Sequence, residues 1–254
     1  MKLYRREKAT VDEENPYWMS FSDIMSALLI IFILASVVLI VQIMEIREQL
    51  EEQQQEFTKE IHMLGQADEV RRTILHETAD ELHRRGIRVS VSENDTVLSI
   101  PNEILGFETA EFIIGPQYRE TASQIGNVLA EVILKNNRIK YLDTVFVEGH
   151  TDNRPYQGMS GKGNWGLSAF RAISLWQHWL NVLPDNRSLE SLTNLDGLPV
   201  FSVSGYAETR PVTDVQVSEE DLRANRRIDI RFTIRRPTVE DYQEIQDKYV
   251  DESL

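Results

Sequence analysis

Residues 24–44, IMSALLIIFILASVVLIVQIM, decide the architecture of this chain because they form one apolar stretch without a charged residue. At 1.5 Å per residue, a helix over them is about 31 Å long, which matches the hydrocarbon core of a bilayer at about 30 Å. A core helix of a soluble protein would show a polar stripe, whereas the scattered polar side chains here are Ser26, Ser36 and Gln42. The sequence therefore predicts a single transmembrane helix, which we place at residues 17–44.

The flanking residues predict the orientation of this helix. The N-terminal tail, residues 1–16, carries four basic residues, whereas residues 45–60 carry two basic residues among six acidic ones. Because basic flanks stay in the cytoplasm, we expect an inner-membrane protein with a cytoplasmic N-terminus and a periplasmic C-terminal part. A cleaved signal peptide is the alternative, but its apolar region is about 7–15 residues long and ends at a small-residue cleavage site. This stretch is longer and runs into Glu45 without such a site.

The composition excludes several classes of function. The chain has 254 residues and a formal net charge of −14, whereas nucleic-acid binding needs a basic face. It has no cysteine, which excludes disulfide scaffolds, thiolate zinc sites and cysteine nucleophiles. No Ser-His-Asp order, nucleophile motif or carboxylate pair indicates a hydrolase, so we predict no enzymatic activity and no cofactor.

Asp23 directly precedes the apolar stretch, and two interpretations of its role are open. As a helix N-cap, its carboxylate would accept a hydrogen bond from a free backbone N–H. If the helix instead begins near Pro16, Asp23 lies about two turns inside it and is a membrane-embedded carboxylate. Such a residue costs about 2.5–3.5 kcal/mol to insert, so it usually faces a partner helix or a polar pathway and carries ions.

Residues 45–86 have the pattern of a helical linker. Gly65 interrupts this pattern, so we expect a second helix from about Ala67 to Arg85 that stops at Gly86. Apolar spacings of three, four and seven predict a short parallel coiled coil between two copies of the chain, and a single solvated helix is the alternative. The apolar positions are Ile43, Ile46, Leu50, Phe57, Ile61 and Leu64.

Residues 87–236 alternate between strand and helix patterns. This order indicates an α+β domain of the β-α-β-α-β type, with helices on a mixed sheet. The acidic tail, residues 237–254, follows, and its apolar residues Val239, Tyr242, Ile245 and Tyr249 fit one helical stripe. The expected elements are a hairpin over 88–100, helices over 118–134 and 165–180, a short helix that Ser218 caps, and strands over 141–149, 200–205 and 228–234.

Two parts of the chain resemble known families. Tyr17-Trp18-Met19-Ser20-Phe21-Ser22-Asp23-Ile24-Met25 resembles the membrane entry of MotB-type stator subunits, in which the matching aspartate binds the transported ion. Ser22 stands where that family usually has alanine. Residues 87–236 resemble the OmpA-like peptidoglycan-binding domain. That resemblance rests on four blocks in order: VEGHTD at 147–152, Asn164-x-x-Leu167-Ser168-x-x-Arg171-Ala172, GYAETRP at 205–211 and RANRRI at 223–228.

The second resemblance implies a ligand and a binding site. The ligand of the family is the diaminopimelate of peptidoglycan stem peptides, which offers an ammonium close to a carboxylate. Asp152 would bind the ammonium, and Arg171 would clamp the carboxylate with its two-pronged guanidinium. Asn164 and Leu167 would line the same pocket, and Arg226 would lie nearby.

Less specific roles are open for the same residues. Asp152 could cap a turn, and Arg171 could form a surface ion pair worth under about 1 kcal/mol. His150 and His178 raise the question of a metal, but no third ligand stands at metal spacing in the sequence. We therefore predict no metal site and assign His150 to support of the sheet end.

The combined layout predicts a peptidoglycan-anchored, ion-conducting subunit of a MotAB-like inner-membrane motor, with Asp23 as the ion-binding residue. The implied partners are a second copy of the chain and a MotA-like or ZorA-like membrane subunit, commonly five to two in this family. The short chain and the entry at 17–23 look most like ZorB of the Zorya anti-phage defence systems. The alternatives are a flagellar MotB-type stator subunit and a passive peptidoglycan tether without ion conduction.

Overall fold

The computed structural model describes residues 16–108, 110–158, 161–236 and 238, which fall into two compact units. The first unit ends at Thr58 and the second begins at Lys59. The predicted cytoplasmic tail, up to residue 15, and the predicted stripe from Val239 to Tyr249 lie outside the described residues.

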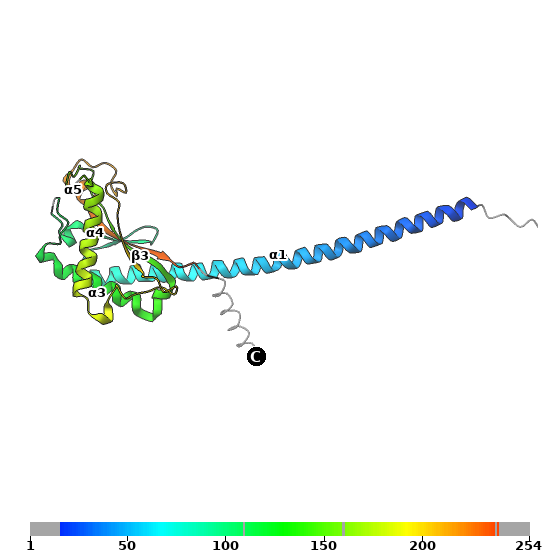
Figure 1. Ribbon diagram of the computed structural model, residues 1–254, viewed down its shortest axis with the longest axis horizontal. Helices are drawn as coiled ribbons and strands as arrows, with labels where there is room; N and C mark the ends of the chain where they lie inside the picture. Colours follow the sequence, from blue (N-terminus) through cyan, green and yellow to red (C-terminus); the bar gives the residue numbers. More distant parts are fainter. Residues whose placement is uncertain (1–15, 109, 159–160, 237, 239–254) are drawn as a thin grey trace, which may run out of the picture. The chain divides into compact units, whose positions relative to one another are not determined.

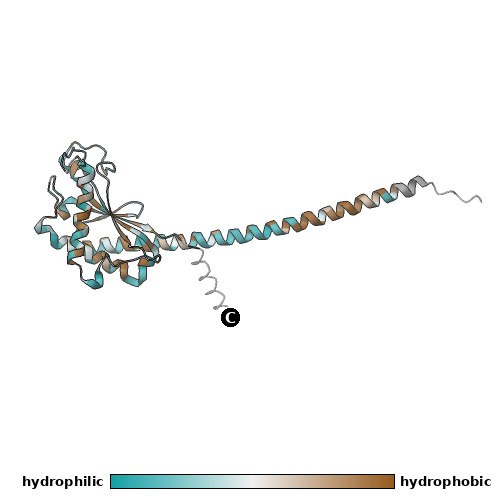
Figure 2. Ribbon diagram, viewed as in Figure 1, coloured by the Kyte–Doolittle hydropathy of each residue, from teal (hydrophilic) through white to brown (hydrophobic). Residues whose placement is uncertain are grey.

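The first unit consists of the N-terminal part of helix α1, which runs from Pro16 to Arg84. Figure 2 shows its apolar stretch in brown, and its mean hydropathy reaches 3.2 over an 18-residue window of which none is buried. Within the described part of the chain, α1 is the one helix that is long and apolar enough to cross a membrane. Because α1 begins at Pro16, Asp23 lies about two turns inside it and does not cap it.

The expected helix break at Gly65 is wrong, because α1 continues through this residue. A glycine costs a helix interior about 1 kcal/mol relative to alanine, and burial of the following turns outweighs that cost. Ala67, Ile74 and Leu82 fall on one helical stripe and are buried. The helix then ends near the predicted place, and Gly86 adopts a φ of +79°, the left-handed conformation typical of a glycine after a helix.

The burial of this stripe places the start of the domain earlier in the chain than the strand pattern indicated. Ile74 and Leu82 belong to the same hydrophobic cluster as the strands and helices of the second unit. The compact unit that holds the sheet therefore begins at Lys59, upstream of the boundary at Ile87 that the sequence indicated. The strand pattern alone did not reveal that the end of the linker helix is a core element.

The second unit is an α+β domain built on one mixed sheet, as predicted (Figure 1). Its five strands have the order β1-β2-β5-β3-β4, in which β3 and β4 pair in parallel and every other pair is antiparallel. Its elements after α1 are β1 (Ser90–Val91), β2 (Val97–Pro101), α2 (Asn102–Leu105), η1 (Pro116–Tyr118), α3 (Arg119–Leu134), η2 (Lys135–Tyr141), β3 (Leu142–Gly149), α4 (Gly163–Val182), η3 (Asp185–Arg187), β4 (Phe201–Gly205), α5 (Glu219–Asn225) and β5 (Arg227–Ile234).

The two faces of the sheet differ in chemistry because side chains alternate along each strand. Leu98, Val147 and Ile230 are in register on one face and are buried in the core cluster, which also includes residues of α3, α4 and the last turns of α1. On the opposite face, Glu148 of β3 is in register with Asp229 of β5. The sheet therefore has an apolar face under the helices and a charged face behind it.

Two glycines bring α4 against the ends of β3 and β4. A Cβ atom on Gly149 would lie 1.9 Å from the backbone oxygen of Ser168, and one on Gly205 would lie 2.4 Å from the backbone nitrogen of Ala169. Only glycine leaves room for this approach. The hydroxyl of Ser168 then accepts a hydrogen bond from the backbone nitrogen of Ala207 at 3.0 Å. These contacts fix the first turns of α4 beside the loop that follows β3.

Candidate functional site

The loop after β3 and the first turns of α4 enclose a pocket of about 260 Å³. The five residues that the sequence analysis assigned to a peptidoglycan site all line it, although some are far apart in the chain. The lining residues are Ala110, Thr151, Asp152, Arg154, Pro155, Tyr156, Asn164, Leu167, Arg171 and Arg226.

Asp152 is 5% exposed and accepts hydrogen bonds from two guanidinium groups. Its Oδ2 accepts from Nη1 of Arg226 at 2.6 Å and from Nη2 of Arg154 at 2.7 Å. Burial alone would raise the pKa of Asp152, but the hydrogen bonds from Arg154 and Arg226 outweigh it and hold the pKa below its ordinary value of 3.8. Oδ1 also accepts from the backbone nitrogen of Arg154 at 3.1 Å, so Asp152 both caps a turn and presents a buried anion to the pocket.

Arg171 enters the pocket from α4 and is 2% exposed. Its Nε donates to the backbone oxygen of Glu111 at 2.9 Å, and its Nη2 donates to that of Glu108 at 3.2 Å. Among the described residues, no acidic side chain forms an ion pair with it. Burial, followed by repulsion from Arg226, lowers the pKa of Arg171 to about 10, so the group stays charged at neutral pH. Arg171 is therefore a buried cation that can accept an anion, and the surface ion pair considered from the sequence is wrong.

Asn164 holds the pocket loop in shape through its own hydrogen bonds. Its Nδ2 donates to the backbone oxygen of Arg154 at 3.1 Å and to Oε2 of Glu208 at 3.0 Å. Its Oδ1 accepts from the backbone nitrogen of Tyr156 at 3.1 Å. Because these partners engage both ends of the amide, Asn164 positions the loop, while Leu167, 5% exposed, supplies an apolar wall.

Arg226 is fixed by a second carboxylate outside the pocket lining. Its Nη2 donates to Oε1 of Glu219 at 2.7 Å, and Glu219 is the first residue of α5. Ser218 caps α5 as predicted, because its hydroxyl accepts from the backbone nitrogen of Asp221 at 3.1 Å. The capped helix thus positions Glu219, which in turn holds Arg226 against Asp152.

Arg154 is the pocket residue that the sequence analysis missed. It follows Asp152 by two positions in a loop, where neither helical nor strand periodicity applies, and the resemblance carries no role onto it. Its contact with Asp152, together with a longer one from its Nη1 to Oε2 of Glu219 at 3.4 Å, raises the pKa of Arg154 above its ordinary value. The one available signal was the presence of a strong cation next to a candidate anion.

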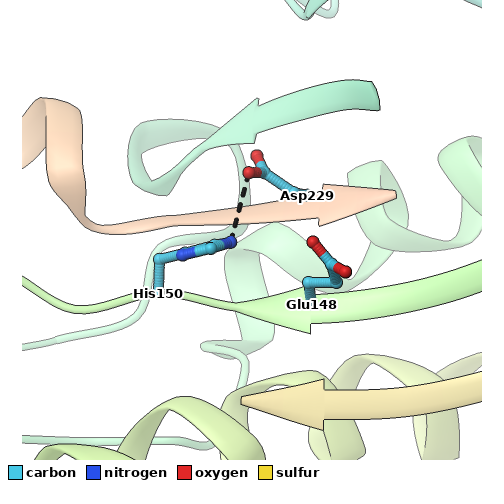
Figure 3. A group of neighbouring side chains, drawn as sticks. All are labelled: Glu148, His150 and Asp229. Carbon is cyan, nitrogen blue, oxygen red and sulfur yellow. Dashed lines mark ion pairs between the residues drawn. The ribbon is translucent and has the colours of Figure 1, made fainter. Parts of the chain in front are cut away.

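A second group of ionisable side chains lies on the charged face of the sheet (Figure 3). Glu148, His150 and Asp229 offer three potential ligand atoms within 4.8 Å of one another, so the structure supplies the metal spacing that the sequence did not show. Nε2 of His150 lies 3.1 Å from Oδ2 of Asp229. The other metal candidate, His178, is absent from this group and its Nε2 lies 2.9 Å from the hydroxyl of Ser123.

Arginines already occupy both carboxylates of this group. Nε and Nη2 of Arg231 each donate to Glu148 at 2.9 Å, and Nε of Arg227 donates to both oxygens of Asp229 at 3.0 Å. A divalent cation would have to displace two guanidinium groups from a buried position. We therefore assign the group to the stability of the sheet, which agrees with the structural role expected of His150.

Comparisons with known proteins find sequence relatives of part of this chain. No family model matches the sequence. Motility protein B of Bacillus subtilis (strain 168) is 25% identical over 144 residues, which cover 57% of this chain and 47% of that protein. Over that stretch, the chain is therefore similar in sequence to Motility protein B. The chain is also 36% identical over 86 residues to the uncharacterized protein YtxE of the same strain, covering 33% of this chain and 30% of that protein.

The chain spans about half or less of the length of these curated relatives. Among solved structures, the putative MotB like protein from Desulfovibrio vulgaris is similar with a TM-score of 0.48 and 18% identity. That match covers 68% of this chain and 99% of the solved chain.

Proposed function

We propose that this MotB-like chain anchors an inner-membrane motor to peptidoglycan through the pocket around Asp152 and Arg171. One observation carries the wall-binding role: a buried carboxylate and a buried guanidinium line one pocket, and the guanidinium has no carboxylate partner among the described residues. An amino acid centre that carries both an ammonium and a carboxylate, as diaminopimelate does, complements this pair. The domain then faces the periplasm, where peptidoglycan is found.

Binding to purified peptidoglycan tests this role. Arg171→Ala leaves the ligand carboxylate without its partner, and truncating one member of a buried charge pair costs about 2–5 kcal/mol, so pull-down should be lost. Arg187→Ala is the matched control, because Arg187 is 39% exposed and pairs with Glu131 outside the pocket lining. Tryptophan fluorescence, to which the buried Trp179 contributes, verifies folding of each variant. Retained pull-down by folded Arg171→Ala would place the wall site elsewhere.

The motor role rests on Asp23. A carboxylate two turns inside an apolar helix is costly in a bilayer, and a passive tether has no use for it. A group that alternates between charged and neutral forms can bind and release a cation, and each charge that crosses the membrane carries about 2.3 kcal/mol per 100 mV. We assign ion conduction to Asp23 in a complex of two copies of this chain with a ring of MotA-like subunits.

Ion flux into vesicles that contain the chain and its MotA-like partner tests this assignment. Asp23→Asn should abolish the flux while membrane insertion and complex assembly remain. Glu45→Gln is the control, because it removes a carboxylate just beyond the apolar stretch of the same helix. Normal flux through the Asp23→Asn complex would leave only the tethering role.

We further assign the motor to Zorya-type anti-phage defence, on the resemblance of residues 17–23 to the entry of ZorB. Deleting the gene should then make cells more sensitive to phage and leave swimming unchanged. Loss of swimming with unchanged phage sensitivity would assign the motor to motility. Neighbouring genes provide a second check, because a helicase or nuclease gene accompanies defence and chemotaxis genes accompany motility.

A further inference from the structure

The place that a ligand ammonium would take on Asp152 is already occupied by a side chain of the protein. Nη2 and Nε of Arg154 donate to Oδ2 of Asp152 at 2.7 Å and 3.2 Å. The same oxygen accepts from Arg226 at 2.6 Å. An incoming ammonium therefore meets a carboxylate whose Oδ2 two guanidinium groups already occupy, and one of them leaves if the ammonium takes that oxygen.

The two arginines differ in their freedom to leave. The side chain of Arg226 is 10% exposed and is held on its other side by Glu219. The side chain of Arg154 is 45% exposed, and Glu219 lies 3.4 Å from its Nη1 as an alternative partner. Arg154 can therefore exchange Asp152 for Glu219 and solvent, whereas the buried Arg226 would lose Asp152 without gaining access to solvent.

The charge of the pocket decides which ligands make this exchange favourable. Its described lining carries one carboxylate, Asp152, and the guanidinium groups of Arg154, Arg171 and Arg226. A ligand that offers an ammonium alone replaces one cation on Asp152 with another and leaves Arg171 without an anion. A ligand that also offers a carboxylate gives an anion to Arg171 and to the displaced Arg154.

We propose that Arg154 is a built-in competitor for the ammonium position on Asp152, and that it makes the pocket selective for ligands carrying an adjacent ammonium and carboxylate over ligands carrying an ammonium alone. This inference rests on the proposed wall binding. It assigns to Arg154 a specificity role beyond the recognition of diaminopimelate by Asp152 and Arg171.

Two synthetic tripeptides separate the two ligand classes. L-Ala-γ-D-Glu-meso-diaminopimelate carries the side-chain carboxylate, and L-Ala-γ-D-Glu-L-lysine lacks it but keeps the ammonium. Their affinities are measured by calorimetry for the full chain in detergent, for Arg154→Gln and for Arg154→Lys. Arg223→Gln is the matched control, because Arg223 is 59% exposed and contacts Glu219 at 3.8 Å without lining the pocket.

Arg154→Gln should bind the lysine peptide about fivefold more tightly than the unaltered chain does. That factor corresponds to the upper end of the free energy of an ion pair with a half-exposed cation. The preference of this variant for the diaminopimelate peptide over the lysine peptide should fall by about the same factor. Arg154→Lys keeps a cation and should retain most of the preference, and Arg223→Gln should match the unaltered chain. An unchanged preference in Arg154→Gln, or weaker binding of both peptides, would overturn the inference.

Failure of the proposed function gives a different result. If the unaltered chain and Arg171→Ala bind the diaminopimelate peptide equally, or neither binds it, the pocket is not the wall site and the role of Arg154 falls with it. If Arg171→Ala alone loses binding and Arg154→Gln keeps the original preference, wall binding stands and the competitor role is refuted.

Discussion

Replacing Arg231 with methionine tests the ion pairs on the charged face of the sheet. Arg231 donates twice to Glu148, and Glu148 is 1% exposed and in register with Asp229 on the neighbouring strand. Methionine keeps much of the volume and removes the charge. Glu148 would then be a buried anion next to a second buried anion, and among the described residues Arg210 alone would remain within ion-pair distance, at 3.8 Å and on a 47% exposed side chain.

Removing one partner of a buried ion pair costs about 3–5 kcal/mol, because the other charge stays buried without compensation. For a domain of 150–250 residues, each kcal/mol shifts the melting temperature by about 2–4 °C, so we expect a decrease of roughly 6–20 °C. Glu148→Gln combined with Arg231→Met removes both charges and should regain most of this loss. The exposed control, Arg223→Met, should change the free energy of unfolding by less than about 0.5 kcal/mol.

Tryptophan fluorescence of the detergent-solubilised chain reports the transition. The ring of Trp179 is buried, and its Nε1 donates to the backbone oxygen of Ala122 at 2.7 Å, so unfolding of the domain exposes it to water. A loss below about 1 kcal/mol in Arg231→Met would mean that the pair behaves as a surface pair. A double variant no more stable than Arg231→Met would refute the assignment of the loss to an unpaired Glu148.

Three further predictions concern the pocket and the elements that form it. Peptidoglycan binding should be constant from pH 5 to 8 and fall at higher pH. The ligand ammonium loses its proton there, and the guanidinium of Arg171, whose pKa is about 10, also becomes neutral and no longer pairs with a carboxylate. Pull-down over pH 5–11 measures this, and a midpoint between pH 6 and 7 would indicate a histidine instead. Asp152 stays charged over that range because its pKa lies below 3.8. Gly149→Ala places a Cβ atom 1.9 Å from the backbone oxygen of Ser168 and should lower the free energy of unfolding by about 1–3 kcal/mol. Gly65→Ala, with nothing within 4 Å of the added Cβ atom, should raise it by about 0.5–1 kcal/mol. Equal effects of the two substitutions in thermal melts would contradict the close approach of α4. Ser218→Ala removes the cap of α5 and should cost about 1 kcal/mol in the same melts, and an unchanged melting temperature would show that α5 does not depend on its capping box.

Local patterns were sufficient to predict most elements of the domain. The alternation along residues 88–100 gave the β1–β2 hairpin, and the Ser218 motif gave the start of α5, because both signals lie within a few neighbouring residues. Gly65 misled for the opposite reason. A glycine destabilises a helix only slightly. The helix continues beyond Gly65 because its following turns are buried against strands and helices that are distant in the sequence.

The site residues also differ in whether their roles follow from sequence motifs or from contacts that only the fold creates. Asp152 and Arg171 could be named from motif blocks, and the structure places both on one pocket. The role of Arg154 depends on the geometry of a loop, and the pairing of Glu148 with Arg231 depends on strand register. Neither loop geometry nor register follows from the residue types alone, which is why both contacts became visible only in three dimensions.

The position of the pocket also determines how the domain would bear force. Asp152 closely follows β3 and Arg226 directly precedes β5, and these two strands are the inner neighbours of the sheet, flanked by β4 and β2. A pull on a molecule held by the pocket would therefore enter the sheet through the ends of its central strands. Because both strands would be pulled from the same end, the load passes to β2 through the antiparallel β2–β5 row, whose hydrogen bonds run perpendicular to the strand axes and are sheared together instead of being peeled one at a time. Such a connection would resist tension because several hydrogen bonds would have to break at the same time.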